Sequence, residues 1–324
     1  PQTEKIMLLP ENSPYPSISY CLCFLCLLIV NDGYAQKRMV RIDSTEIWLN
    51  TIGIEDRKEG QAIIVFESGY GTPMDHWDKV LAGVSAMAPV LTYERPGIGQ
   101  SKAIDEMPTV KNVADRLLRI LKHLDLAPPY VLVGHSLGGL YVLGFANYYP
   151  EVLAGMILID PADFTETHQN KRLYYEVLHW EEDKIDQLIQ SFIDQRLAGK
   201  EQVPLSLQRE SQVLETLRAN EFKTINEVEL PNIPIHIITG GRFDKPQKLR
   251  SKEYDEEALF RSKMKHRVQR WTDVIQSVDK GMIFYSGDAG HFVHYDDPLL
   301  LIASVQIVLN DCQLLKKERD AQKH

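Results

Sequence analysis

An α/β fold with a mostly parallel central sheet and flanking helices is predicted by two features of the sequence. Short apolar runs alternate with longer segments of helical periodicity, and several of these runs end at Gly. This alternation is typical of parallel strands, because a crossover helix must return the chain to the edge where the previous strand began. A third feature, a long helical stretch between two of the runs, adds a helical cap to the prediction.

Continuous apolar runs bounded by turn residues predict strands that are buried on both faces of the sheet. The first of them, "VRIDSTEIWLNTIG", predicts an N-terminal strand or hairpin. The segments with this strand pattern are 40–53, 62–69, 89–97, 130–136, 155–162, 233–241 and 281–291.

Two segments between or after these runs carry a helical stripe of apolar residues. Segment 109–126 has apolar residues at positions 113, 117, 120, 121 and 124, which fall on one helical face. In segment 256–278 the apolar face is expected to pack against the sheet, and it consists of Met264, Val268, Trp271, Ile275 and Val278.

Residues 163–230 interrupt the alternation, because they have helical patterns and no convincing strand. A crossover between parallel strands needs far fewer residues than this. We therefore expect a helical cap, or lid, inserted after the sixth strand when the hairpin counts as two. The predicted core then comprises residues 37–162 and 231–324.

The N-terminal segment predicts an export leader. The apolar stretch "ISYCLCFLCLLIV" at 18–30 is short for a membrane span. Gly33 and Ala35 follow it at the spacing of a signal-peptidase site. We expect residues 1–36 to be a signal peptide, and the mature protein to be periplasmic or secreted. The alternative is an uncleaved leader that anchors the protein to the membrane.

Composition and charge narrow the classes of partner and cofactor. The net charge of −9 argues against a nucleic-acid partner, since binding phosphates requires a basic face. Three of the four Cys residues lie in the leader, so only Cys312 would remain after cleavage. A single Cys forms no internal disulfide and provides no Cys-x-x-Cys zinc site. No cofactor and no metal is expected, and the expected partner is a small molecule.

The segment "YVLVGHSLGGLYVLGF" carries the strongest chemical signal. Gly134-His135-Ser136-Leu137-Gly138 matches Gly-x-Ser-x-Gly, and it stands between an apolar run and a helical pattern. In this strand–turn–helix context the motif forces Ser into a strained turn, which exposes its hydroxyl at the sheet edge. Gly is needed on both sides because the flanking backbones come close together. Ser136 is therefore the predicted nucleophile.

On these residues and four further segments, over about residues 38–312, the chain resembles the α/β-hydrolase fold family, in its serine esterase and lipase-like branch. "FESGYGTPMDHW" resembles the family's oxyanion loop in a Glu-x-Gly version, and "YERPGIGQS" resembles the turn after the next strand. "IHIITGGRFD" resembles the segment that delivers the catalytic acid, and "GDAGHFVHYDDP" the loop that carries the catalytic His.

The resemblance implies a role for each matching residue. His291 becomes the base that activates Ser136, since an imidazole suits proton transfer at neutral pH. The backbone N–H groups of Tyr70 and Leu137 become the oxyanion hole. The candidates for the pocket wall are Gly69, His135 and His294, although His135 must point away from Ser136 and a solvated position also suits His294.

Two residues compete for the acid that orients His291. Asp160 and Asp244 both follow apolar strands, and either preserves the chain order Ser, Asp, His. We predict Asp244, because the Gly-rich "TGGRFD" overhang would let its carboxylate reach a His delivered by the next strand. Asp160 leads directly into the cap and is expected to fix the entry to it or to cap a turn.

These roles predict a serine hydrolase that cleaves a carboxylic ester or a related acyl bond through an acyl-enzyme. A Ser nucleophile is also compatible with a carbon–carbon bond hydrolase, an aminopeptidase, an acyltransferase or a cofactor-free haloperoxidase. A non-catalytic ligand-binding protein of the same fold is a further alternative, but such proteins usually lack a triad residue.

Overall fold

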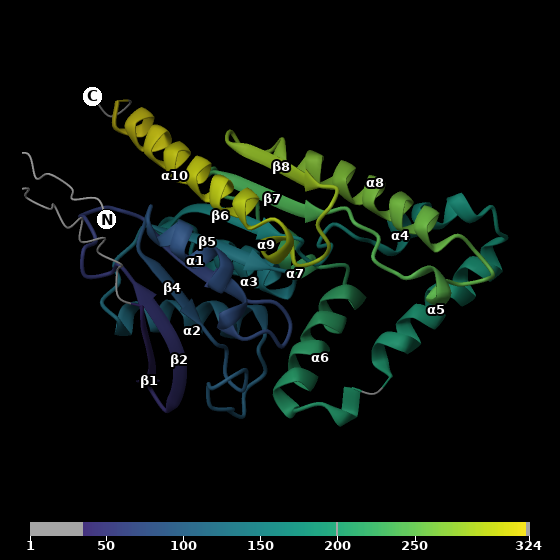
Figure 1. Cartoon of the computed structure of the whole chain (residues 1–324), viewed down its shortest axis with the longest axis horizontal. Helices are drawn as coiled ribbons and strands as arrows, with labels where there is room; N and C mark the ends of the chain where they lie inside the picture. The colour runs from purple at the N-terminus through teal and green to yellow at the C-terminus, as the bar shows by residue number, and fades with distance from the viewer. Residues whose placement is uncertain (1–34, 199, 322–324) are drawn as a thin grey trace, which may run out of the picture. The chain divides into compact units, whose positions relative to one another are not determined.

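The computed structural model describes residues 35–198 and 200–321, and a central sheet runs through them (Figure 1). Most of the predicted leader, residues 1–34, lies outside the described part. The described strands form one sheet of eight, in the order β1-β2-β4-β3-β5-β6-β7-β8. The strands are β1 (Gln36–Ile42), β2 (Thr45–Ile52), β3 (Ile63–Glu67), β4 (Val90–Tyr93), β5 (Tyr130–His135), β6 (Leu153–Ile159), β7 (Ile235–Gly240) and β8 (Gly281–Ser286).

The sheet is mostly parallel, as the sequence predicted. β1 and β2 form the N-terminal hairpin, and β2 pairs antiparallel with β4. All the other neighbouring strands pair in parallel. Side chains along the central strands alternate between two apolar clusters, because successive residues of a strand face opposite sides of the sheet. On β5, for example, Leu132 belongs to one cluster, and Val131 and Val133 belong to the other.

Helices cover both faces of this sheet. α2, α3 and α8 contribute buried residues to the cluster on one face, whereas α1 and α10 contribute to the other. The helical elements around the sheet are η1 (Met74–Trp77), α1 (Asp78–Ser85), α2 (Val110–His123), α3 (Leu137–Tyr148), η2 (Pro150–Val152), η5 (Gln247–Leu249), α8 (Glu256–Ile275), α9 (Val293–Asp296) and α10 (Pro298–Ala321).

Two of these helices bear directly on the sequence analysis. The predicted apolar face of α8 does pack on the sheet, with Trp271 and Ile275 buried in its cluster. α10 is long and apolar enough to cross a membrane by length and composition. Leu301, Val305 and Val308 of α10 are nevertheless fully buried in the cluster on the other face, as in the core helix of a globular domain.

The segment after β6 is helical, as predicted, and β7 is the next strand along the chain. α5 and α6 extend beyond the edge of the sheet at which β6 and β7 have their carboxyl ends (Figure 1). The helical elements of this insertion are α4 (His168–Arg172), η3 (Leu173–Leu178), α5 (Glu182–Leu197), η4 (Lys200–Gln202), α6 (Leu205–Ala219) and α7 (Lys223–Asn226).

Candidate active site

Ser136 occupies a tight turn between β5 and α3. Its backbone has φ 53° and ψ −116°, a conformation that non-glycine residues rarely adopt. A Cβ on Gly134 would lie 2.6 Å from the carbonyl oxygen of Gly138, and a Cβ on Gly138 would meet the backbone of Glu67 and Ser68. Gly134 therefore permits the close contact within the turn that the sequence suggested, and Gly138 permits the turn to pack against the end of β3.

His291 lies in the loop after β8, and the structure pairs it with Asp160. The His291 Nδ1 atom lies 2.6 Å from Oδ2 of Asp160. Asp160 directly follows β6, the neighbour of the strand that carries Ser136. Ser136, Asp160 and His291 all line one cavity.

The predicted pairing of Asp244 with His291 is wrong. The Asp244 side chain is 59% exposed and forms an ion pair with Arg242 at 2.5 Å between Oδ1 and Nε. The Asp160 side chain, by contrast, is only 10% exposed. His291 is therefore paired with Asp160, the residue that the sequence analysis had placed at the entry to the cap.

The crossing of the His291 loop over the end of β7 explains this outcome. A Cβ on Gly240, the last residue of β7, would lie 2.5 Å from the carbonyl oxygen of Ala289. Since Gly240 has no side chain, the loop packs directly on the end of β7 and carries His291 across to the end of β6. The long overhang of Asp244 is then not needed to reach the imidazole.

Neighbouring groups hold the Asp160 carboxylate in place. The hydroxyl of Thr239 on β7 donates to Oδ1 at 2.7 Å, and Nη1 of Arg267 lies 3.6 Å from the same oxygen. Burial alone would raise the pKa of Asp160, but the hydrogen bond to His291 and the charge of Arg267 outweigh it and lower the pKa. Asp160 is therefore held as an anion that fixes Nδ1 of His291 as a hydrogen-bond donor.

The oxyanion loop packs closely against the nucleophile turn. A Cβ on Gly69 would lie 2.8 Å from Nδ1 of His135 and 3.4 Å from Cβ of Ser136. Leu137 is the first residue of α3, where backbone N–H groups have no partner within the helix. Within the described part of the chain, neither the Leu137 nor the Tyr70 N–H donates a backbone hydrogen bond. Both predicted donors are thus free of backbone partners, and they lie on the two segments that meet at Gly69 and Ser136.

A buried ionic network, which the sequence analysis missed, holds the oxyanion loop. Arg95 forms ion pairs with Glu67 at 2.5 Å and with Glu210 at 2.6 Å. Its guanidinium also donates to the carbonyl oxygens of Ser68 at 2.6 Å and Gly69 at 2.7 Å. Glu67 and Arg95 stand in the two family-like motifs. Glu210 belongs to α6 of the insertion, and no local pattern connects it to them.

Replacing Arg95 with Met is expected to destabilise the protein by about 3–5 kcal/mol, since it leaves two buried carboxylates without their cation. Urea unfolding monitored by circular dichroism measures this loss. Arg119→Met is the matched control, because Arg119 forms only an exposed ion pair with Asp43. The control should lose at most about 1 kcal/mol. Equal losses in the two variants would contradict a structural role for the network.

His135 and His294 are buried and are not among the described residues that line the cavity. Each is 1% exposed, and their rings lie 4.8 Å apart. Burial, reinforced by neighbouring imidazoles, lowers the pKa of His135 to about 3 and that of His294 to about 2. The expectation that they form part of the pocket is therefore wrong, and a solvated His294 is wrong too. Nε2 of His135 contacts the His291 carbonyl oxygen at 2.9 Å, so His135 supports the loop.

Gly69, the third candidate for the pocket wall, also falls outside the cavity lining among the described residues. Its backbone packs against the nucleophile turn, and Arg95 holds its carbonyl oxygen. Gly69 therefore shapes the oxyanion loop, which requires a residue without a side chain at this contact.

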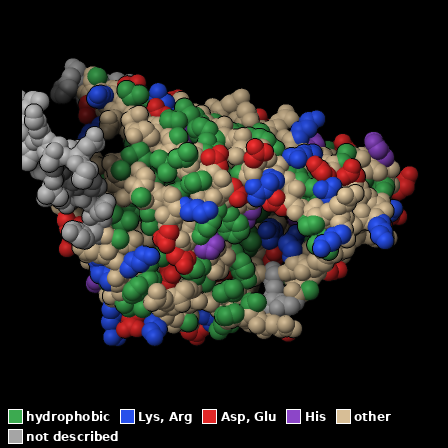
Figure 2. Space-filling model, viewed as in Figure 1, with side chains coloured by type: hydrophobic (Ala, Val, Ile, Leu, Met, Phe, Trp, Pro, Cys, Tyr) green, Lys and Arg blue, Asp and Glu red, His purple; other side chains and the backbone are tan. Residues whose placement is uncertain are grey.

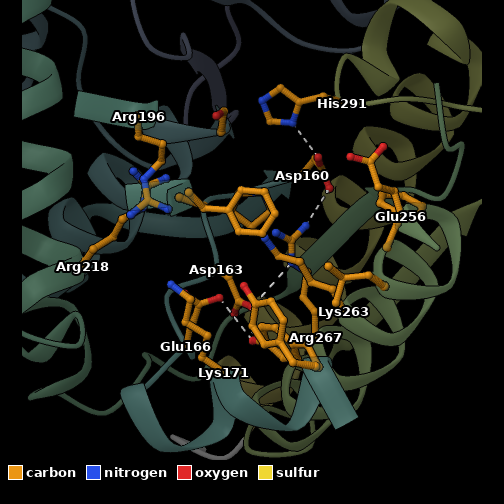
Figure 3. Close-up of a pocket in the computed structure, with 18 of the residues that line it drawn as sticks. Asp160, Asp163, Glu166, Lys171, Arg196, Arg218, Glu256, Lys263, Arg267 and His291 are labelled. Carbon is orange, nitrogen blue, oxygen red and sulfur yellow. Dashed lines mark hydrogen bonds and ion pairs between the residues drawn. The ribbon is translucent and has the colours of Figure 1, made fainter. Parts of the chain in front are cut away.

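The cavity around Ser136 has a volume of about 670 Å³. The molecular surface is hollowed, with basic side chains inside the hollow (Figure 2). Core residues supply one side of the cavity, and the insertion supplies another through Tyr174, Tyr175, Phe192 and Arg218. Figure 3 shows His291 and Asp160 on one side of this cavity, with Arg196 and Arg218 across from them.

The part of α8 from Glu256 to Arg267 also lines the cavity, which the sequence analysis did not predict. Phe260, Lys263 and Arg267 point into it, while Trp271 and Ile275 further along the helix pack on the sheet. The spacing of Lys263, Arg267 and Arg270 along one helical face is a signal that could have revealed this wall. In residues 35–198 and 200–321, no group of three or more His, Cys, Asp or Glu side chains could hold a metal ion.

Comparison with known proteins yields a family match and several partial relatives. A family model described as "alpha/beta hydrolase fold" matches residues 62–243. The Bacillus subtilis protein YqjL is 36% identical over 99 residues, which cover 31% of this chain and 39% of YqjL. A pimeloyl-[acyl-carrier protein] methyl ester esterase of Hamiltonella defensa is 26% identical over 160 residues, or 49% of this chain and 59% of the esterase. The matched region thus spans less than two thirds of either relative.

Among solved structures, the epoxide hydrolase CorEH is similar with a TM-score of 0.56. The similarity covers 86% of this chain and 99% of CorEH, at 14% sequence identity. At this identity, the likeness concerns the fold alone.

Proposed function

Because the chain belongs to the α/β-hydrolase fold family, we propose that it is a serine hydrolase that cleaves a carboxylic ester or a related acyl bond. One observation carries the proposal. Ser136, in a strained strand–helix turn, shares a cavity with His291, whose Nδ1 is paired with buried Asp160. This is the arrangement of a nucleophile, a general base and an orienting acid.

In the proposed reaction, His291 accepts the Ser136 proton at Nε2 as the hydroxyl oxygen attacks the substrate carbonyl. The backbone N–H groups of Tyr70 and Leu137 stabilise the resulting oxyanion. His291 then donates its proton to the leaving alcohol, and an acyl-enzyme remains on Ser136. A water molecule, deprotonated by His291, releases the acid and restores the hydroxyl of Ser136.

Asp160 keeps its negative charge throughout and stabilises the imidazolium that forms twice in the cycle. Its lowered pKa supports this role, since the group stays ionised at neutral pH. The insertion at 163–230 is proposed to act as the cap over the acyl-binding cavity, because its side chains share the cavity lining with Ser136.

Labelling of Ser136 by a fluorophosphonate tests the proposal directly. The activated hydroxyl should take up one label, and mass spectrometry of the digested protein should place that label on residue 136. Ser136→Ala should abolish labelling. Ser277→Ala, which changes an exposed serine, should leave labelling unchanged. Equal labelling of the Ser136→Ala variant and the unchanged protein would contradict the proposal.

A panel of p-nitrophenyl esters of increasing chain length, with matched anilides, tests whether the protein cleaves esters in preference to amides. An ester hydrolase should turn over the esters and leave the anilides nearly untouched, whereas an aminopeptidase would cleave the anilides as well. The export leader stays a prediction from the sequence, which N-terminal sequencing of the secreted protein would test.

A further inference from the structure

The cavity that contains Ser136 is lined by more cationic than anionic side chains. The basic residues in its wall are Lys171, Arg196, Arg218, Lys245, Lys263 and Arg267. The acidic residues are Asp160, Asp163, Glu166 and Glu256. Most of these come from the insertion and from α8. All of them except Lys245 are labelled around the cavity in Figure 3.

Each of the four carboxylates already has a cationic partner. Asp160 is paired with His291 and lies near Arg267, and Asp163 is 2.5 Å from Arg270. Two lysines neutralise the other carboxylates. Nζ of Lys171 lies 3.5 Å from Glu166, and Nζ of Lys245 lies 2.6 Å from Glu256. Each acidic residue of the wall thus has a protein cation at one of its oxygens at least.

Lys263 has no such counter-ion. Among the described residues, no carboxylate lies within ion-pair distance of its ammonium group, although the side chain is half-buried in the cavity wall. Arg196 and Arg218, on another part of the wall, share the single carboxylate of Glu215 at 3.5 and 2.6 Å. The cavity therefore carries positive charge that the protein itself does not neutralise.

Burial and the nearby Arg267 lower the pKa of Lys263 to about 8. The charged groups around it are Arg267 and Lys171, which oppose its charge, and Asp163 and Glu166, which favour it. Burial is the largest of these effects, so an anion placed beside Lys263 would offset part of the cost of keeping its charge away from water.

Apolar side chains lie in the same cavity as these cations. Phe192, Leu214, Phe222, Leu259 and Phe260 supply surfaces that suit a hydrocarbon chain. An apolar wall with an unneutralised cation is suited to a chain that ends in a charged group.

We propose that Lys263 binds an anionic group, a carboxylate or a phosphate, at the end of the substrate remote from the bond that Ser136 attacks. The substrate class is then an ester whose acyl chain carries a terminal anion. The identity of the substrate rests on the proposed hydrolase function, whereas the anion site itself does not depend on catalysis.

The kinetic test compares mono-p-nitrophenyl esters of adipic, pimelic and suberic acid with the same esters capped by a methyl group. The esters with a free acid should have the higher kcat/KM. The chain length with the largest preference then indicates the distance between Ser136 and the anion site at Lys263. Lys263→Met should reduce that preference about 10- to 100-fold, because a charge-assisted hydrogen bond is lost. Lys263→Arg should restore most of it.

Lys265→Met is the matched control, since Lys265 lies on the same helix, is exposed and does not line this cavity. It should keep the full preference for the anionic esters. Phosphonate-ended esters of the same lengths identify the anion, because a phosphate site would prefer them to the carboxylates. An equal rate for free and capped esters, or a preference unchanged in Lys263→Met, would overturn the proposal.

The preference should also weaken as the pH rises above about 8, since Lys263 then loses the charge that attracts the anion. Below pH 8 the ammonium form dominates, and the preference should reach a plateau. The Lys263→Arg variant should not show this decline, because Arg stays protonated.

A binding measurement separates the failure of this site from the failure of the hydrolase proposal. In the Ser136→Ala protein, calorimetry should detect binding of pimelic acid monoamide and a much weaker binding of the neutral diamide. Anion binding by this variant, together with no ester hydrolysis by the unchanged protein, would support the site and contradict the proposed function. Ester hydrolysis without anion binding would overturn the site and leave the proposed function in place.

Discussion

Replacing Ser136 with Ala is expected to lower kcat on a p-nitrophenyl ester by about 10⁶-fold, to the level of residual catalysis by binding and the oxyanion hole. The reason is chemical, because the hydroxyl that forms the acyl-enzyme is removed while the cavity and His291 remain. Steady-state kinetics with active-site titration measure the effect.

The Ser136→Ala variant should remain folded, so its loss of activity is attributable to chemistry. Ser136 makes no side-chain capping bond to α3, and Ala has the same backbone preferences at a positive φ. Circular dichroism and thermal unfolding should match those of the unchanged protein. A residual kcat above about one hundredth of the original would assign the nucleophile to another residue.

Replacing Asp160 with Asn is expected to lower kcat by about 10⁴-fold, with little change in KM. An Asn side chain can present its amide N–H₂ to His291, which favours the imidazole tautomer with the proton on Nε2. That tautomer cannot accept the Ser136 proton. The same change also removes the negative charge that faces Arg267 and stabilises the imidazolium.

Asp244→Asn is the matched control for Asp160, since both changes neutralise a carboxylate that follows a strand. Asp244 is exposed and contacts Arg242, so its variant should retain kcat within a few-fold. Both variants are measured on one ester after circular dichroism has confirmed that they are folded. The reverse ranking would transfer the orienting role to Asp244 and contradict the pairing of His291 with Asp160.

The local motifs of the sequence were sufficient to predict the fold and the position of Ser136. Buried strands appear as continuous apolar runs because both faces of the parallel sheet are covered, and the observed strands follow those runs. The turn at Ser136 was predictable because its constraint is local. Gly134 is required two residues before Ser136 because a Cβ there would meet the carbonyl oxygen of Gly138 in the same turn, whereas Gly138 is required by a contact with the end of β3 at Glu67 and Ser68.

The acid that holds His291 was decided by tertiary structure, because strand order and loop path are not local properties. In the sequence Asp160 and Asp244 are equivalent, since each follows a buried strand. In the sheet β6 lies beside β5, and the loop from β8 crosses the end of β7 at Gly240 to reach it. Asp160 therefore meets His291 across 131 positions of the chain, whereas Asp244 is left in solvent.

The charged groups of the site depend even more on tertiary contacts. Arg95 meets Glu210 from a distance of 115 positions, and Lys263 lines the cavity because α8 packs against η3 of the insertion. No sequence spacing predicts such contacts, since they form only when whole helices and strands pack together. The sequence by itself determined the architecture and the nucleophile, while the three-dimensional packing decided which charges surround that nucleophile and which of them remain without a partner.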